Sequence, residues 1–202
     1  EIRADGAGLR TLPMIDEPDV DNYDACYLPD GRIVFTSTAP FTGVPCVRGS
    51  AHVANLYLLE PDGRIRQLTF EQDHDWCPTP LPNGRVLYLR WEYTDIPHFV
   101  SRILFTMNPD GTGPMIFFGN QHPDTVMIDA KPVPGTGCVV ASFSPGHGRT
   151  EHDGYITLVD PSRGPDEPAA AVPLTADPAY RDPYPLTADL FLAARDREIV
   201  LL

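Results

Sequence analysis

The feature that most constrains this chain is an internal repeat with a period of about 50 residues. One phrase consists of two short apolar runs separated by a turn, and its clearest copy covers residues 26–37, around Pro29-Asp30-Gly31. Asp-Gly and Asn-Gly dipeptides permit the positive φ that tight hairpin turns require, and β-branched and aromatic runs beside them favour strands. The phrase therefore predicts a β-hairpin. Further copies, two of them looser, cover residues 80–88, 132–140 and 183–191.

A second hairpin phrase alternates with the first one. Its copies cover residues 56–69 and 104–118, and a shorter opening copy covers residues 1–12 around Asp5-Gly6. Two hairpins in each period predict one four-stranded antiparallel sheet per period, and radial repetition of such sheets is typical of a β-propeller. A β-sandwich with regular hairpins is the alternative, but it gives no reason for the strict alternation of the two phrases. We therefore expect an all-β propeller with four-stranded blades.

The repeat also predicts the blade boundaries within a single partial propeller domain, residues 1–202. About three and a half blades are expected. Because a propeller must close to bury its end blades, we expect the chain to be a fragment of a six- to eight-bladed propeller. The expected ranges are 1–13 for the end of one blade, 23–70, 75–119 and 127–176 for three full blades, and 183–202 for the start of another.

Charge and hydropathy exclude several classes of partner. The chain has 15 basic and 28 acidic residues and a net charge of −13, which disfavours binding to nucleic acid or to anionic lipid heads. No apolar run approaches the roughly 18 residues of a membrane helix, so membrane insertion is not expected. The four cysteines do not form a dense framework, and a disulfide between Cys26 and Cys46 stays open as an alternative.

Histidine and acidic residues gather in the connections opposite the hairpin turns. Antiparallel strands place the Asp-Gly and Asn-Gly turns on one rim, so the connections that contain all six histidines fall on the other rim. On this loop-rich rim Cys46, His74, His98 and His147 are the candidate ligands of a transition metal, because imidazole and thiolate bind such metals well. Asp75, Trp91, Glu92 and Asp95 are further candidates. The alternative is structural: His74 and Asp75 cap a connection between blades, and Trp91 packs between blades.

Two resemblances refine these expectations. The phrases Leu-Pro-Asp-Gly-Arg-Ile at 28–33 and Met-Asn-Pro-Asp-Gly-Thr-Gly at 107–113 resemble the TolB-like propeller repeat. Longer motifs at 27–38, 43–46, 73–78, 90–98 and 182–186 resemble the hydrazine synthase alpha-subunit-like proteins of planctomycete-type bacteria, specifically their middle propeller region. That resemblance implies an extracytoplasmic location, in the periplasm or an organelle lumen, and c-type haem domains elsewhere in the protein. The chain itself contains no C-x-x-C-H motif for haem attachment.

Three functions follow from the resemblance. The first is a non-catalytic propeller scaffold that docks haem domains or other protein subunits on the loop-rich rim. The second is a metal- or haem-dependent redox site on the same rim, which would form nitrogen–nitrogen bonds as in hydrazine synthase, with zinc, iron or c-type haem held in the full-length protein. The third is a TolB-like protein-interaction module without redox chemistry. The scaffold is the interpretation that we adopt.

Overall fold

The computed structural model describes residues 1–92, 102–122, 125–145 and 152–202, apart from the side chain of Cys46. Strands dominate it, and the helical elements are single turns. None of the helices in these ranges is long and apolar enough to span a membrane. The elements are β1 Asn22–Tyr27, β2 Ile33–Ser37, η1 Pro45–Val47, β3 Asn55–Leu59, β4 Ile65–Gln67, β5 His74–Pro80, β6 Val86–Trp91, β7 Arg102–Met107, β8 Met115–Phe118, β9 Val126–Pro132, β10 Val139–Ser144, β11 Tyr155–Val159, η3 Pro161–Arg163, η4 Pro168–Ala170, β12 Ala171–Pro173, β13 Arg181–Pro185, β14 Phe191–Arg195 and β15 Glu198–Leu201.

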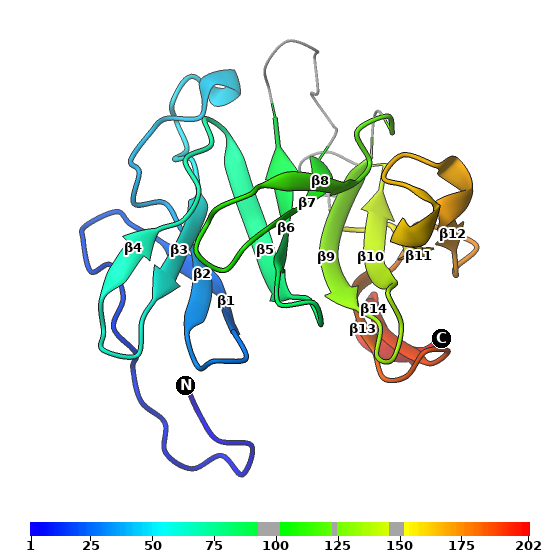
Figure 1. Ribbon diagram of the computed structural model, residues 1–202, viewed down its shortest axis with the longest axis horizontal. Helices are drawn as coiled ribbons and strands as arrows, with labels where there is room; N and C mark the ends of the chain where they lie inside the picture. Colours follow the sequence, from blue (N-terminus) through cyan, green and yellow to red (C-terminus); the bar gives the residue numbers. More distant parts are fainter. Residues whose placement is uncertain (93–101, 123–124, 146–151) are drawn as a thin grey trace.

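The strands form consecutive antiparallel sheets, as the repeat predicts. β1 to β4 pair in sequence order, as do β5 to β8 and β9 to β12, and a single parallel pair between Arg102 and Val126 links the second sheet to the third. The described part of the last sheet contains the three strands β13, β14 and β15. The first strand of each sheet contacts the first strand of the next, so the sheets fan out from a common axis. Figure 1 shows them side by side in chain order, which confirms a β-propeller arrangement.

Asp-Gly turns close the hairpins for a local chemical reason. Gly63 has a φ of 86°, a left-handed conformation that glycine adopts without steric cost. The Asp62 carboxylate accepts hydrogen bonds from the Arg64 backbone N–H at 3.1 Å and from Arg64 Nε at 2.7 Å. The same pattern recurs at Asp30-Gly31. The turns between β1 and β2, β3 and β4, and β5 and β6 lie on the lower side of Figure 1, opposite the β2–β3 connection.

Every innermost strand contains the same irregularity. One residue in each has a φ between 50° and 56°, in the left-handed region, and the register with the second strand shifts at that point. These shifts are β-bulges, which bend a strand and re-aim its side chains. The four residues are Asp24, Cys77, Asp129 and Asp182.

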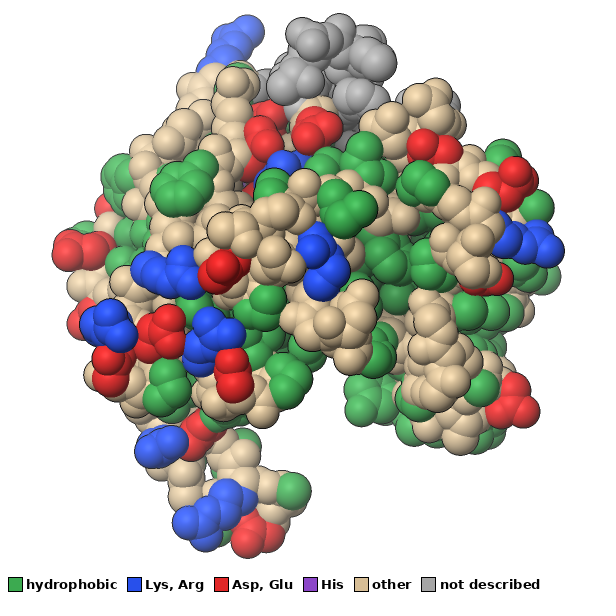
Figure 2. Space-filling view, viewed as in Figure 1, with side chains coloured by type: hydrophobic (Ala, Val, Ile, Leu, Met, Phe, Trp, Pro, Cys, Tyr) green, Lys and Arg blue, Asp and Glu red, His purple; other side chains and the backbone are tan. Residues whose placement is uncertain are grey.

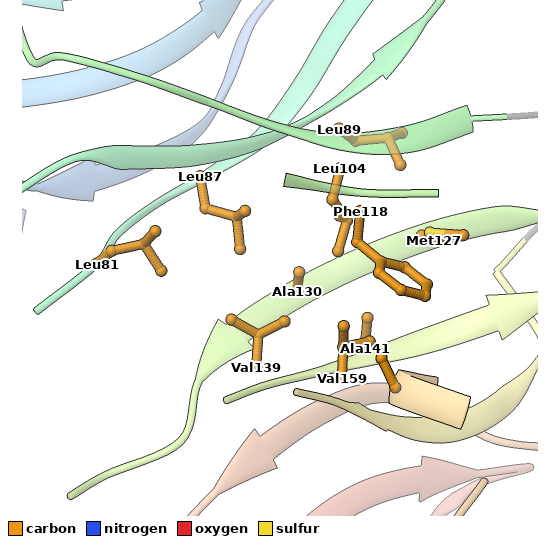
Figure 3. Close-up of a cluster of buried hydrophobic side chains, with 11 residues drawn as sticks. Leu81, Leu87, Leu89, Leu104, Phe118, Met127, Ala130, Val139, Ala141 and Val159 are labelled. Atoms are coloured by element: carbon orange, nitrogen blue, oxygen red, sulfur yellow. The ribbon is translucent and has the colours of Figure 1, made fainter. Parts of the chain in front are cut away.

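The hydrophobic core lies between the blades. Leu87, Leu89 and Leu104 of the second sheet pack against Val139 and others of the third, as Figure 3 shows. Val34 and Leu58 of the first sheet pack against the second sheet in the same way. Both faces of the second sheet are therefore buried between two other sheets, which explains why β7 is buried along its whole length.

The N-terminal segment differs from its expectation. The sequence predicts that residues 1–13 complete a blade, yet the structure has no strand in residues 1–21. The Asp5-Gly6 turn does form, since the Gly6 N–H donates to the Arg3 carbonyl at 2.9 Å. An outer strand exists only when it pairs with a third strand, and none of the described strands pairs with this segment.

Candidate functional site

A cavity of about 510 Å³ opens where the innermost strands approach one another. Strands β1, β5 and β9 form its floor, and the connection between β2 and β3 forms one side. Most of its lining is apolar and aromatic, and a few polar groups converge on it, which is the usual composition of a binding site. The described lining residues are Tyr23, Asp24, Val44, Val47, Ala51, His74, Trp76, Cys77, Trp91, Arg102, Ile128 and His152.

Three stacked rings form one wall of this cavity, which we call the aromatic wall: His74, Trp76 and Trp91. The His74 ring lies 4.3 Å from the Trp76 ring at 18° between planes, and 5.6 Å from the Trp91 ring at 12°. The register of the two strands explains the stack, because His74 pairs with Trp91 across β5 and β6, and alternate residues of β5 share a face. The wall contains both tryptophans of the chain.

His74 is held as a neutral hydrogen-bond donor. Its Nδ1 accepts a hydrogen bond from the backbone N–H of Ala54 at 3.1 Å. Burial, together with the nearby Arg102 guanidinium, lowers the pKa of His74 to about 4. A neutral imidazole whose Nδ1 is an acceptor carries its proton on Nε2. The ring therefore offers an N–H at Nε2 and has no free lone pair in this state.

A buried positive charge lies behind the aromatic wall. The Arg102 guanidinium carbon is 4.8 Å from the centre of the Trp91 ring and 5.9 Å from that of Trp76. Arg102 is only 3% exposed, so water screens this cation–π interaction weakly. The wall consequently combines flat π surfaces with a fixed cation. Such a surface suits a planar, π-rich group.

Tyr23 and Cys77, two further side chains that line the cavity, stay uncharged at neutral pH. Trp76 Nε1 donates to the Tyr23 hydroxyl at 3.2 Å, and burial raises the pKa of Tyr23 to about 12. The Cys77 thiol lies 3.7 Å from Asp24 Oδ2, and burial raises its pKa well above the ordinary value. A thiol of this kind stays protonated at neutral pH, so it is a poor nucleophile.

The structure brings some of the predicted site residues together and separates others. His74 and Trp91 line the cavity. Asp75 lies on the other face of β5, fully buried, and accepts hydrogen bonds from Arg90 at 2.9 and 3.2 Å. Glu92 lies 4.0 Å from the same Arg90.

The remaining predicted ligands fall outside the description. Asp95, His98 and His147 lie outside the described residues, and Cys46 lies in η1 without a described side chain. Within the described ranges, no group of three or more His, Cys, Asp or Glu residues is placed to hold a metal ion. The four-residue metal set therefore stays a prediction. Cys26 is a free thiol in this structure, so the alternative disulfide with Cys46 does not form here.

Sequence reasoning missed Tyr23, Arg102 and His152 as members of the site. They come from β1, from the start of β7 and from the connection before β11, so only the fold brings them together. The sequence did contain one regular spacing that marks corresponding residues of the inner strands. Asp24, Cys77 and Asp129 each precede the turn proline of the first hairpin phrase by the same number of residues.

The fold and its axial cavity define the class of this chain as a β-propeller protein. No family model and no curated protein matches it. Among solved structures, it resembles hydrazine synthase from Kuenenia stuttgartiensis with a TM-score of 0.67 and 20% identity, covering 85% of this chain and 26% of that chain. It also resembles a puromycin hydrolase with a TM-score of 0.59 and 20% identity, over 90% of this chain and 29% of the hydrolase.

A third similar structure is a putative gluconolactonase, with a TM-score of 0.51 and 16% identity over 87% of this chain and 55% of that chain. The chain spans only about a quarter of the hydrazine synthase chain and somewhat more of the hydrolase. Likeness at these identities establishes the propeller fold alone, because one fold supports many chemistries.

Proposed function

We propose that this chain is a propeller scaffold of an extracytoplasmic, hydrazine synthase alpha-like protein, and that its axial cavity docks a haem-bearing domain or subunit of that protein. The observation that carries the proposal is the aromatic wall of His74, Trp76 and Trp91 backed by the Arg102 cation. A haem is a planar π system, and its flat face matches the stacked rings of this wall. The motif resemblance and the structural likeness to hydrazine synthase support the same protein class.

A docking role fits the protonation states better than catalysis by this segment does. His74 is neutral with its proton on Nε2, and Cys77 is a protonated thiol. Neither is poised as a nucleophile. Ligation of a metal through Nε2 of His74 would require the ring proton to move to Nδ1, which would break the hydrogen bond from Ala54. The redox alternative would thus depend on Cys46, His98 and His147, and zinc or iron content that falls when His98 and His147 are replaced by Ala would favour it.

The test uses the two tryptophans as reporters, because both line the cavity. The chain is titrated with a c-type haem peptide, prepared by proteolysis of a cytochrome c, while tryptophan fluorescence is recorded. We expect saturable quenching at one peptide per chain. Ala51→Phe places a ring at the exposed edge of the cavity and should weaken binding at least tenfold.

The matched control is Ala169→Phe, since Ala169 is also exposed but does not line the cavity. Its affinity should equal that of the wild type. Docking at this cavity would be contradicted if the quenching does not saturate. It would also be contradicted if Ala51→Phe and Ala169→Phe bind the peptide equally well.

A further inference from the structure

The polar groups of the axial cavity are more selective than those of the outer surface. Around the turns of the first sheet, Arg32 binds Asp30 and Arg64 binds Asp62, each at 2.7 Å. Figure 2 shows acidic and basic side chains interspersed on that part of the surface, so its charge does not select a ligand. The cavity differs, because two hydrogen-bond donors line it and none of the described residues accepts a hydrogen bond from either of them.

The first donor is the Nε2–H group of His74. Because Nδ1 of the neutral ring accepts a hydrogen bond from the Ala54 N–H, the ring proton is fixed on Nε2. The ring lies between the two indoles, with its centre 4.3 Å from that of Trp76 and 5.6 Å from that of Trp91. A flip of the ring would move Nδ1 away from Ala54. The structure therefore fixes both the orientation and the tautomer of this donor.

The second donor is the hydroxyl of Tyr23. Its oxygen accepts a hydrogen bond from Trp76 Nε1 at 3.2 Å, so its own proton remains available. The hydroxyl stays protonated at neutral pH, because burial raises the pKa of Tyr23 to about 12. Trp76 contacts both donors, since its face stacks on His74 and its edge binds Tyr23. Each donor group already accepts one hydrogen bond, which strengthens its own donation.

The charges around the cavity favour an uncharged ligand. The Asp24 carboxylate is part of the lining and would repel an anion. The Arg102 guanidinium carbon lies 4.8 Å from the centre of the Trp91 ring, and its charge would repel a cation. His74 adds no charge at neutral pH, since its pKa is about 4. The cavity therefore suits a neutral molecule whose polar atoms are hydrogen-bond acceptors.

The size and the shape of the cavity restrict the ligand further. A volume of about 510 Å³ is in the range that small-molecule sites have, and the aromatic wall suits a flat ring. We propose that the cavity binds a small, uncharged, flat conjugated ring that carries carbonyl oxygens, as a quinone does, and that Tyr23 and His74 donate hydrogen bonds to those oxygens. Carbonyl groups also withdraw electrons from the ring, which favours stacking on electron-rich indoles.

This inference goes beyond the docking of a haem-bearing domain and does not depend on it. The ring would occupy the cavity when that domain does not. A docked haem needs the aromatic wall, whereas the small ligand also needs the two donors. The two proposals therefore make different demands on Tyr23, and experiments can separate them.

Isothermal titration calorimetry with duroquinone, a benzoquinone that carries four methyl groups, tests the inference. All its ring carbons are substituted, so the thiols of the chain have no open ring position to attack. We expect saturable binding of one molecule per chain. Tyr23→Phe removes the O–H and keeps the ring, so it should weaken binding about tenfold, the effect of one lost neutral hydrogen bond. Tyr184→Phe is the matched control, because Tyr184 is exposed and does not line the cavity, and it should bind as the wild type does.

A second probe separates hydrogen bonding from the fit of the ring. Durene has the ring and the four methyl groups of duroquinone but no carbonyl oxygen, and it should bind about tenfold more weakly or less. Ala51→Phe narrows the exposed edge of the cavity and should weaken the binding of duroquinone as well. The inference would be overturned if duroquinone does not bind saturably or if durene binds equally well. Equal affinity of the Tyr23→Phe and Tyr184→Phe chains for duroquinone would also overturn it.

The haem peptide and duroquinone distinguish this inference from the docking role. Tyr23→Phe keeps the aromatic wall, so it should leave the affinity for the haem peptide unchanged. A chain that binds the haem peptide but not duroquinone would contradict this inference alone. A chain that binds duroquinone but not the haem peptide would contradict the docking role alone.

Discussion

The buried charges around β5 and β6 show how single residues fix the position of the aromatic wall. Arg90 is bound in two places by Asp75, and its guanidinium lies 4.7 Å from the centre of the Phe105 ring. This pair ties β5 to β6 on the face opposite the cavity. Because this pair fixes β5 against β6, the rings of His74 and Trp76 can stack on the other face of β5.

The Asp75–Arg90 pair should contribute strongly to stability. Asp75→Ala leaves the guanidinium buried without its bidentate partner, and the free energy of unfolding should fall by about 3 kcal/mol. Glu60→Ala is the control, because the ion pair between Glu60 and Arg66 spans 3.9 Å near the surface. Its removal should lower the free energy of unfolding by less than about 0.5 kcal/mol. Urea denaturation measures both changes. Equal effects would refute a special role for Asp75.

His74 should make stability depend on pH. Its pKa falls from 6.5 to about 4 on folding, so the unfolded chain binds the proton more readily than the folded chain does. Above pH 6.5 the titration of His74 therefore leaves the free energy of unfolding unchanged. As the pH falls toward 4, protonation of the unfolded chain lowers this free energy, by about 3 kcal/mol at most. His74→Gln should flatten the difference between unfolding free energies at pH 7 and pH 4.5.

Gln72, an exposed side chain without a titratable group, provides the comparison for that titration. Gln72→Ala should leave the pH dependence of unfolding as it is in the wild type. A wild-type slope that survives in His74→Gln would show that another group is responsible.

Part of this residue-scale picture could be predicted from the sequence. The sequence indicated His74 as a candidate ligand on the loop-rich rim, and in the structure its side chain lines the cavity. The partners of Asp75 and His74 could not be predicted. Arg90 and Ala54 are reached only through strand pairing and blade contacts, which a linear pattern does not encode.

Turns and bulges govern the shape of the individual blades. The hairpin phrases predicted the turns, since Asp-Gly and Asn-Gly have a well-defined conformational preference. The bulges at Asp24, Cys77, Asp129 and Asp182 were not predicted, because left-handed Asp or Cys residues inside a strand leave no strong local signal. In three blades the bulge residue precedes the turn proline by the same number of residues. This regularity can be recognised as a bulge position only once the strands are aligned in space.

Turn glycines with a positive φ should contribute measurably to the free energy of unfolding. Gly84 has a φ of 85°, and an added Cβ would meet no atom within 4 Å, so Gly84→Ala tests the backbone conformation alone. We expect a loss of about 1–2 kcal/mol. Gly137→Ala, at a site with equal space and without positive φ, should have no such cost. Thermal unfolding of the two variants compares them directly.

At the scale of the whole molecule, the period of the repeat sufficed to predict four-stranded sheets around an axis. The conformation of residues 1–12 could not be predicted in the same way. Their sequence is that of an outer strand, but a strand forms only where another strand can pair with it. No described strand pairs with residues 1–12.

The radial arrangement itself rests on the meeting of inner strands from separate sheets. Asp24 of β1 and Cys77 of β5 are 53 residues apart in the chain, yet their side chains lie 3.7 Å apart at the axis. A cysteine at position 24 should therefore form a disulfide with Cys77, while one at position 30, in the turn at the far end of the hairpin, should not.

The decisive measurement is peptide mapping by mass spectrometry after mild oxidation of Asp24→Cys and Asp30→Cys, each combined with Cys26→Ser. The account predicts a disulfide between position 24 and Cys77 in the first variant and none between position 30 and Cys77 in the second. Absence of the first disulfide, or pairing of position 24 with Cys138 instead, would contradict sheets that fan out from a common axis.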